Sequence, residues 1–151
     1  MENDFLEKTL EDIVFENKFN IKERGFPMFY ENLDRQVYTK NGKIMDLVNF
    51  EEKDGVYYFT IYELKKGKID FSAYSQVLSY YFEEVIRVKS LFKNFKVNLV
   101  LIGNSYEENV LIACAASDII DVYIYKYDYN GIIFKKMTKG FTEFTKLEII
   151  H

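Results

Sequence analysis

Residues 43–65, KIMDLVNFEEKDGVYYFTIYELK, decide the fold because they predict two strands joined by a tight turn. Asp54-Gly55 is a strong hairpin signal, since both central residues of such a turn need positive φ. β-branched and aromatic residues dominate the run after the turn, as is typical of a strand. Asn41-Gly42 and Asn130-Gly131 predict two further hairpin turns, one before this stretch and one near the C-terminus.

Three charged side chains interrupt these apolar strands. Asp46 lies among residues expected to be buried on both faces, where a carboxylate is costly unless it is paired or binds a metal. The hairpin places it opposite residues 62–64 of the second strand. Glu63 and Lys65 share one face of that strand, because side chains alternate along it. A plain ion pair on an edge strand would explain these two residues, whereas two acids and a lysine converging at one end of the sheet favour an active site.

Helical and extended segments alternate along the rest of the chain. Apolar spacing predicts helices in residues 5–17, 71–92 and 107–117, the second of them capped by Asp70 or Ser72. The resulting order is αβββαβαββ, which predicts an α/β fold with a mixed central sheet flanked by helices. No linker or repeat divides the chain, so we expect a single domain. The predicted strands are residues 33–39, 43–50, 56–65, 97–103, 121–128 and 131–137.

Composition limits the chemistry that the chain can perform. Its 24 acidic and 20 basic residues give a net charge of −4, which argues against a simple polycation that coats nucleic acid. His151 is the single histidine, so neither a Ser-His-Asp triad nor a His-rich zinc site is expected. The lone cysteine, Cys114, fits a reducing cytoplasm, and no apolar run is long enough to span a membrane. We therefore expect a cytoplasmic protein without a membrane partner.

The carboxylates point to a divalent cation. Mg²⁺ takes oxygen ligands in octahedral geometry, typically one or two carboxylates together with water and substrate phosphate. Asp46, Glu63 and the main-chain carbonyl of Leu64 could supply such ligands to Mg²⁺ or Mn²⁺. Lys65 would orient or activate a water molecule for in-line attack, or stabilise the charge that develops. The pattern predicts metal-assisted hydrolysis of a phosphodiester.

Asp46 followed by Glu63-Leu64-Lys65 resembles the signature of the PD-(D/E)XK, or restriction-endonuclease-like, nuclease superfamily. Its RecB-like and NucS-like branches also carry an Arg-Gln pair, a short hairpin and the pattern G-x-I-x-D-L. Arg35-Gln36 and the run from Gly42 to Leu47 match that arrangement. Met45 stands where the superfamily usually has proline. The resemblance implies a restriction-endonuclease-like core with a metal-dependent nuclease site.

Further site residues follow from this resemblance, which covers about residues 5–104. The superfamily often has an acidic residue on its first helix, and Glu7 matches it best, with Glu11 as the alternative; this implies a supporting catalytic residue and a further metal ligand. A Gln and a Tyr on the helix after the catalytic strand are matched by Gln76 and Tyr80. The match implies a supporting role in catalysis for Gln76 and a place in the nucleic-acid cleft for Tyr80. A solvated helix face, or a cap on the edge of the sheet, would also explain these residues.

Basic residues near the proposed site complete the expectation. Lys66, Lys68 and Arg35 are expected to contact nucleic acid, DNA rather than RNA, and members of the superfamily often form homodimers. The alternative is a nuclease-fold protein of phage or mobile-element type, which binds nucleic acid or inhibits a protein partner without cutting. Residues 1–34 carry a net charge of −5, nine acidic against four basic, and an acidic surface of this kind can mimic DNA.

Overall fold

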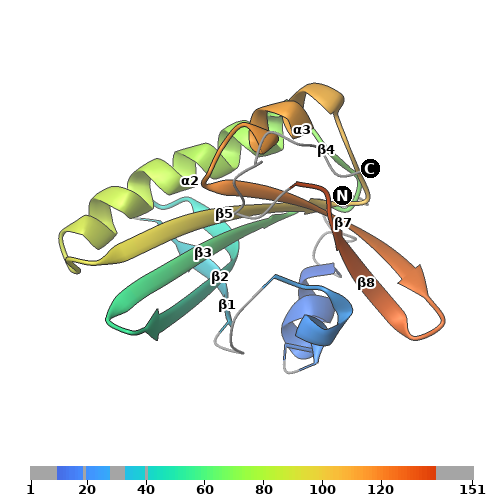
Figure 1. Cartoon of the computed structure of the whole chain (residues 1–151), viewed down its shortest axis with the longest axis horizontal. Helices are drawn as coiled ribbons and strands as arrows, with labels where there is room; N and C mark the ends of the chain where they lie inside the picture. Colours follow the sequence, from blue (N-terminus) through green and yellow to red (C-terminus); the bar gives the residue numbers. More distant parts are fainter. Residues whose placement is uncertain (1–9, 19, 28–32, 40, 139–151) are drawn as a thin grey trace.

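A six-stranded mixed sheet forms the centre of the computed structural model, which describes residues 10–18, 20–27, 33–39 and 41–138. Figure 1 shows helices on one face of this sheet and residues 10–18 and 20–24 on the other. The predicted α/β fold with a mixed central sheet is confirmed, whereas a restriction-endonuclease-like core stays a prediction. In sheet order the strands are β1 (Leu33–Tyr38), β2 (Ile44–Lys53), β3 (Val56–Leu64), β5 (Phe95–Gly103), β7 (Ile120–Asp128) and β8 (Gly131–Lys136).

The order and direction of the strands place β3 at the centre. Strands β1, β2 and β3 form an antiparallel meander, and β5 and β7 then run parallel to β3. Strand β8 returns antiparallel to β7. Parallel neighbours need long crossovers, and the helices α2 (Phe71–Lys89) and α3 (Glu108–Ala115) provide them. Because β3, β5 and β7 are parallel, their C-terminal ends lie at the same edge of the sheet.

Local signals placed the long helix correctly. The Asp70 carboxylate accepts a hydrogen bond from the Ala73 amide at 2.9 Å and so caps α2, as the sequence predicts. Ala73, Val77 and Val88 recur at helical spacing on the side that packs against the sheet, and all three are fully buried. The amphipathic pattern therefore fixes which side of α2 faces β3 and β5.

Two of the hairpin turns show how much a glycine signal specifies. At Asp54-Gly55 both residues have positive φ, 54° and 81°, as a two-residue turn of this kind requires. In the β7–β8 hairpin, Asp128 pairs with Gly131, so the turn residues are Tyr129 and Asn130. The predicted strands, residues 121–128 and 131–137, leave the same two residues for the turn, although Asn130-Gly131 was the signal quoted for it. Of residues 129–131, only Gly131 has positive φ, 112°.

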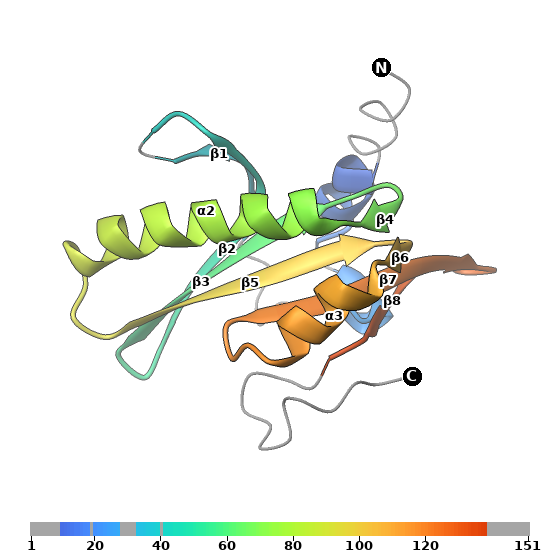
Figure 2. The same ribbon diagram turned by 90° about the horizontal axis from the view of Figure 1, so that it is seen from above.

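Each face of the sheet has its own hydrophobic core. Beneath α2 and α3, Ile61 and Leu99 are almost completely buried. On the opposite face, residues 10–16 are helical and the 3-10 helix η1 (Ile21–Arg24) follows. There Phe26 stacks on Tyr62 with ring centroids 4.9 Å apart. Figure 2 shows α2 and α3 lying across one face and the β7–β8 hairpin projecting beyond the sheet.

A second, two-stranded sheet was not predicted. Strands β4 (Lys68–Ile69) and β6 (Ser105–Tyr106) pair in parallel, and each is too short to give a periodic pattern. This small sheet ties the segment that follows β3 to the segment that follows β5. Gly103 allows the close approach, because a Cβ there would lie 2.6 Å from the Gly67 carbonyl oxygen.

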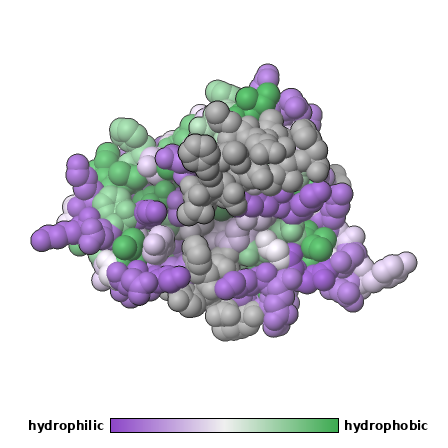
Figure 3. Space-filling model, viewed as in Figure 1, coloured by the Kyte–Doolittle hydropathy of each residue, from purple (hydrophilic) through white to green (hydrophobic). Residues whose placement is uncertain are grey.

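The outer side of α2 keeps apolar side chains exposed to solvent. Phe71, Phe82 and Ile86 all lie on this side and are more than half exposed. Figure 3 shows hydrophobic residues gathered at the upper left, where α2 lies. Among the described residues, no helix combines the length and apolar character needed to cross a membrane.

Candidate active site

The β2–β3 hairpin brings Asp46 and Glu63 to the same end of its ladder. Its paired residues run from Lys53–Val56 at the turn to Leu47–Tyr62. Asp46 and Glu63 are the residues immediately beyond the last of these pairs. Both carboxylates contribute to the raised pKa of Tyr80 on the neighbouring helix, so both lie near its hydroxyl. The turn thus brings the two carboxylates together.

Where the main-chain pairing of β2 and β3 ends, the Asp46 side chain forms the next hydrogen bond between the two strands. Its Oδ2 atom accepts a hydrogen bond from the Leu64 amide at 3.0 Å. In an antiparallel ladder the amide and carbonyl of one residue point to the same side of the strand. The Leu64 carbonyl, which the sequence suggests as a metal ligand, therefore lies on the side of β3 that faces Asp46.

Glu63 is a buried charge on a central strand. Its exposed fraction is 4%, and strands β2 and β5 flank β3 on both sides. A surface ion pair on an edge strand therefore does not explain this residue. The Lys65 ammonium lies 3.9 Å from Glu63 Oε1, and the Lys65 side chain is 25% exposed. The lysine thus lies between a buried carboxylate and solvent, where a substrate could reach it.

Helix α2 adds Tyr80 to the cluster. The Tyr80 hydroxyl donates a hydrogen bond to the Ile44 carbonyl at 3.0 Å and accepts one from the Gln76 amide at 2.5 Å. Burial first, then the Glu63 charge and to a smaller extent the Asp46 charge, raise the pKa of Tyr80 to about 12. Tyr80 therefore lies within the field of both carboxylates. Gln76 is exposed and reaches the cluster through Tyr80.

Glu83 also belongs to this cluster, although the sequence analysis did not single it out. Its charge contributes to the raised pKa of Tyr80, and its side chain is 10% exposed. The Lys43 ammonium lies 3.5 Å from Glu83 Oε2 and donates to the Ser79 hydroxyl at 3.1 Å. This contact fixes the start of β2 against α2. Glu83 lies three residues after Tyr80 on the same helix, and residues at this spacing are neighbours on the helix surface. This spacing could have identified Glu83 from the sequence.

Arg35 lies on the other face of the sheet, beside residues 10–16. Its guanidinium donates to Glu11 at 2.5 Å and also to Asp12, and the hydrogen bond to Asp12 is the main reason that the pKa of Arg35 is raised. Two carboxylates of the chain itself therefore engage Arg35, which is not presented beside Asp46 for nucleic acid. Glu7, four residues before Glu11 in the sequence, lies outside the described residues.

Gln36 has a strained backbone in the middle of β1. Its φ is 53°, a conformation that costs about 1–3 kcal/mol for a non-glycine residue unless its surroundings hold it there. Its amide donates to Glu11 at 2.5 Å on the face of residues 10–16. In the β1–β2 register, Gln36 stands opposite Asp46, between the pairs Arg35–Leu47 and Val37–Met45. The regular ladder is thus interrupted on both sides of Asp46.

The segment after β3 presents three lysines and is held in place by its main chain. The Lys65 amide donates to the end of β5 at 2.7 Å, and the Gly67 carbonyl accepts from the residue that follows β5 at 2.9 Å. The Tyr125 hydroxyl of β7 donates to the Lys66 carbonyl. Lys66 is partly exposed and Lys68 is exposed. The predicted phosphate contacts Lys66 and Lys68 therefore follow the candidate site on a fixed segment.

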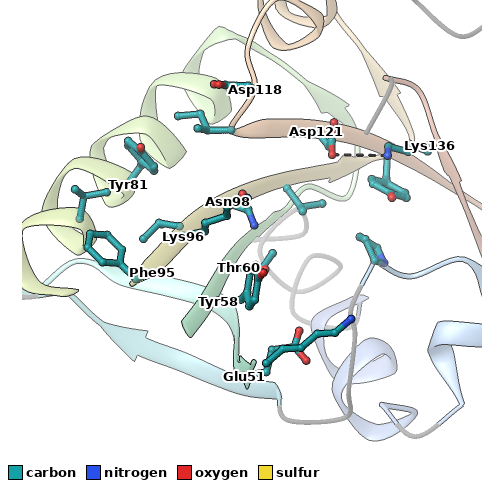
Figure 4. Close-up of a pocket in the computed structure, with 17 residues that line it drawn as sticks. Glu51, Tyr58, Thr60, Tyr81, Phe95, Lys96, Asn98, Asp118, Asp121 and Lys136 are labelled. Atoms are coloured by element: carbon teal, nitrogen blue, oxygen red, sulfur yellow. Dashed lines mark ion pairs between the residues drawn. The ribbon is translucent and has the colours of Figure 1, made fainter. Parts of the chain in front are cut away.

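A hollow of about 780 Å³ lies elsewhere on the sheet, and none of the predicted site residues lines it. Figure 4 shows Glu51 and Asp121 on opposite sides of this hollow, with Thr60 and Asn98 between them. Asp121 accepts a hydrogen bond from the Thr138 hydroxyl at 2.7 Å and lies 3.9 Å from a lysine ammonium. The lining contains three acidic and three lysine side chains, so its formal charges balance: Glu51, Asp118 and Asp121 against Lys53, Lys96 and Lys136.

The oxygen donors of the candidate site suit a hard divalent cation. Within the described ranges, no group of three or more His, Cys, Asp or Glu side chains is placed to hold a metal ion. Asp46 and Glu63 supply two carboxylates, and Leu64 supplies a carbonyl on the same side. Mg²⁺ commonly takes one or two carboxylates and completes its shell with water and substrate phosphate. The chemistry of these oxygen donors therefore suits Mg²⁺ or Mn²⁺.

No family model, curated protein or solved structure matches the chain. The resemblance to the PD-(D/E)XK superfamily therefore depends on the quoted residues. Function is best argued from the chemistry of the site, because one fold hosts many functions.

Proposed function

We propose that the protein is a metal-dependent nuclease that hydrolyses phosphodiester bonds, with DNA as its substrate. The observation that supports this proposal is the convergence of Asp46 and Glu63 on adjacent strands, with the Lys65 ammonium 3.9 Å from Glu63, where the β2–β3 ladder ends. A divalent cation bound there would neutralise phosphate charge and lower the pKa of bound water. These are the groups that hydrolysis of a phosphodiester requires.

The contacts of each residue suggest its role. Asp46, oriented by the Leu64 amide, and Glu63 would hold the cation together with the Leu64 carbonyl, and Glu7 would add a further ligand. The Lys65 ammonium would orient the attacking water, or stabilise the negative charge that develops on the phosphate oxygens. Tyr80 would act as a positioning residue, because its hydroxyl fixes the start of β2 through the Ile44 carbonyl.

The substrate strand would leave the site along the lysine segment. Lys66 and Lys68 follow Lys65 directly, and contacts from lysine to phosphate oxygens position nucleic acid without reading its sequence. Gln76 is exposed on α2 and donates a hydrogen bond to Tyr80, so it would lie beside the substrate strand where that strand leaves the site. These contacts favour a nuclease with little sequence preference.

A cleavage assay with matched variants tests the proposal. Plasmid and single-stranded DNA are incubated with and without Mn²⁺, using the parent protein, Asp46→Asn and Lys65→Met. Asp34→Asn on β1 and Lys89→Met at the end of α2 remove the same charges from exposed positions and serve as controls. We expect metal-dependent cleavage by the parent and both controls. We also expect a loss of about 100-fold or more in the two site variants.

Circular dichroism of each variant checks that the fold is retained, so that loss of cleavage reports on the site. Intact DNA after incubation with a large excess of folded parent protein would overturn the proposal. That outcome would favour a nuclease-fold protein that binds without cutting.

A further inference from the structure

The β7–β8 hairpin continues beyond the sheet as a two-stranded arm, residues 125–135. The pairing of β5 with β7 ends at Gly103–Ile124, whereas β7 runs on to Asp128 with β8 as its partner. Exposure rises along β7 toward the tip, and Figure 2 shows the hairpin projecting past the sheet. The arm extends from the edge where β3 ends, and therefore from the edge that carries the candidate site.

The arm presents aromatic rings to solvent. Tyr129 at the tip is fully exposed and Tyr127 is 62% exposed. The ring of Tyr125 packs edge-to-face on that of Tyr127, with centroids 6.0 Å apart. A tyrosine ring offers a large, flat contact area for a small loss of conformational freedom. Exposed rings of this kind serve as platforms on which unpaired bases stack, and such stacking is tolerant of sequence.

Positive charge lies on the face of the arm opposite Tyr127, because side chains alternate along the two paired strands. Lys126 and Lys135 are exposed, and no described residue forms an ion pair with either. The carboxylate of the arm, Asp128, is bound to Arg24, whose hydrogen bond is the main reason that the pKa of Asp128 is lowered. The charge left uncompensated on the arm is therefore positive, which suits a polyanion.

Two anchors fix the direction of the arm. The Tyr125 hydroxyl donates to the Lys66 carbonyl, so the base of the arm touches the lysine segment of the candidate site. On the strand β8, the Ile132 carbonyl accepts from Arg24 Nε at 3.1 Å. A chain of phosphates leaving Lys65 along this segment would therefore meet the arm next.

We infer that the arm is a platform for single-stranded nucleic acid. Unpaired bases beside the scissile bond would stack on Tyr127 and Tyr129, while the charge of Lys126 and Lys135, on the opposite face of this narrow arm, would attract the phosphates. The inference deepens the proposed nuclease function and depends on it for the identity of the scissile bond. An unpaired strand fits better than a duplex, because bases within a duplex are already stacked on their neighbours. A protein partner could also cover exposed tyrosines, but the uncompensated lysines favour a polyanion.

Binding measured without cleavage tests the arm. Fluorescence anisotropy in EDTA uses Asp46→Asn as the parent, a short labelled single strand and the matching duplex. The double substitution Tyr127→Ala/Tyr129→Ala should weaken single-strand binding by about tenfold or more, since stacking contributes about 1–3 kcal/mol per base. Duplex binding should change far less. Phe82→Ala, which removes an equally exposed ring from α2, should leave both affinities unchanged.

The outcomes separate this inference from the proposed function. Equal single-strand affinity of the double variant and its parent would overturn the platform, whether or not the wild-type protein cuts DNA. Tyrosine-dependent self-association with unchanged DNA affinity would overturn it too and assign the arm to contact between copies. Tyrosine-dependent binding of single strands would support the platform even if no cleavage is found, in which case the nuclease proposal alone fails.

Discussion

Glu63 and Asp121 are both buried acids of the central sheet, 4% and 2% exposed, but their surroundings differ. Asp121 accepts a hydrogen bond from Thr138 at 2.7 Å, and the Thr138 hydroxyl is itself bound by the Val122 amide. Glu63 instead lies near a second carboxylate, Asp46, at the end of a strand ladder. Acids placed together in this way repel one another unless a cation is present. The first arrangement stabilises the fold, and the second is suited to binding.

The largest expected difference between the two acids is in catalysis. Glu63→Gln should lower metal-dependent DNA cleavage by about 100-fold or more, because it removes a ligand charge at the site. Asp121→Asn should leave cleavage within a few-fold of the parent. Initial rates on plasmid DNA with Mn²⁺ measure both variants. Similar losses in the two variants would show that burial, and not position, decides the effect.

Stability should rank these sites in the opposite order. Thr138→Val removes the hydrogen bond that the buried Asp121 carboxylate accepts from the Thr138 hydroxyl and should lower the free energy of unfolding by about 1–3 kcal/mol. Glu63→Gln relieves repulsion with Asp46 and should lower it by less, or raise it. Urea unfolding in EDTA, followed by circular dichroism, gives both values. A larger loss in Glu63→Gln than in Thr138→Val would contradict the assignment of Asp121 to the fold and Glu63 to the site.

The strained residue beside the site offers a smaller test. Gln36→Val places a β-branched side chain at a φ of 53° and should destabilise the protein by about 1–3 kcal/mol. Gln36→Gly loses the hydrogen bond to Glu11 but accepts this backbone freely, so its loss should be smaller. Tyr38→Val, in the same strand with an ordinary backbone, controls for the residue type. Equal unfolding free energies for Gln36→Val and Gln36→Gly would show that the strain has no energetic consequence.

The smallest expected effect is on proton binding. The pKa of Tyr80 is raised from its usual 10 to about 12, so the folded state holds this proton more tightly than the unfolded state. The corresponding stability is fully present below pH 10 and is lost as the pH rises toward about 12. Glu63→Gln should lower the pKa of Tyr80, while burial still keeps it above 10.

NMR of tyrosine Cζ resonances against pH measures this titration, and Asp121→Asn is the matched control. It should leave Tyr80 unchanged and lower the pKa of Tyr123, which burial and then the Asp121 charge raise. An unchanged pKa of Tyr80 in Glu63→Gln would mean that Glu63 does not act on the α2 side of the site.

Local rules were enough to predict part of the fold and the pairing at the site. Asp54-Gly55 fixes the turn, and the register of the two strands then brings Asp46 and Glu63 to the same end of the ladder. Asp70 begins α2 because a carboxylate at that position satisfies a free amide. Each of these features depends on residues close in sequence or on one ladder, and for this reason the sequence predicts them.

Features set by contacts between distant segments could not be predicted. Nothing in a glutamine indicates that Gln36 adopts a left-handed conformation, which goes with its bond to Glu11 on a separate helix. Glu83 is buried against Lys43 from another element. Gln76, expected to support the site directly, is exposed and acts through Tyr80. The projection of the β7–β8 arm depends on where β5 ends.

Gly103, at the end of β5, carries no functional group, yet it sets how far the lysine segment can reach. A Cβ at this position would lie 2.6 Å from the Gly67 oxygen and 2.8 Å from Ile69 Cγ1. Even alanine would therefore have to push outward the segment that bears Lys65 and Lys68. The absence of a side chain at Gly103 thus allows the segment that carries the lysine ammonium groups to lie close to the end of β5. A search for catalytic residues by charge alone would pass over Gly103, where an added methyl group would displace the lysine segment and leave its charges unchanged.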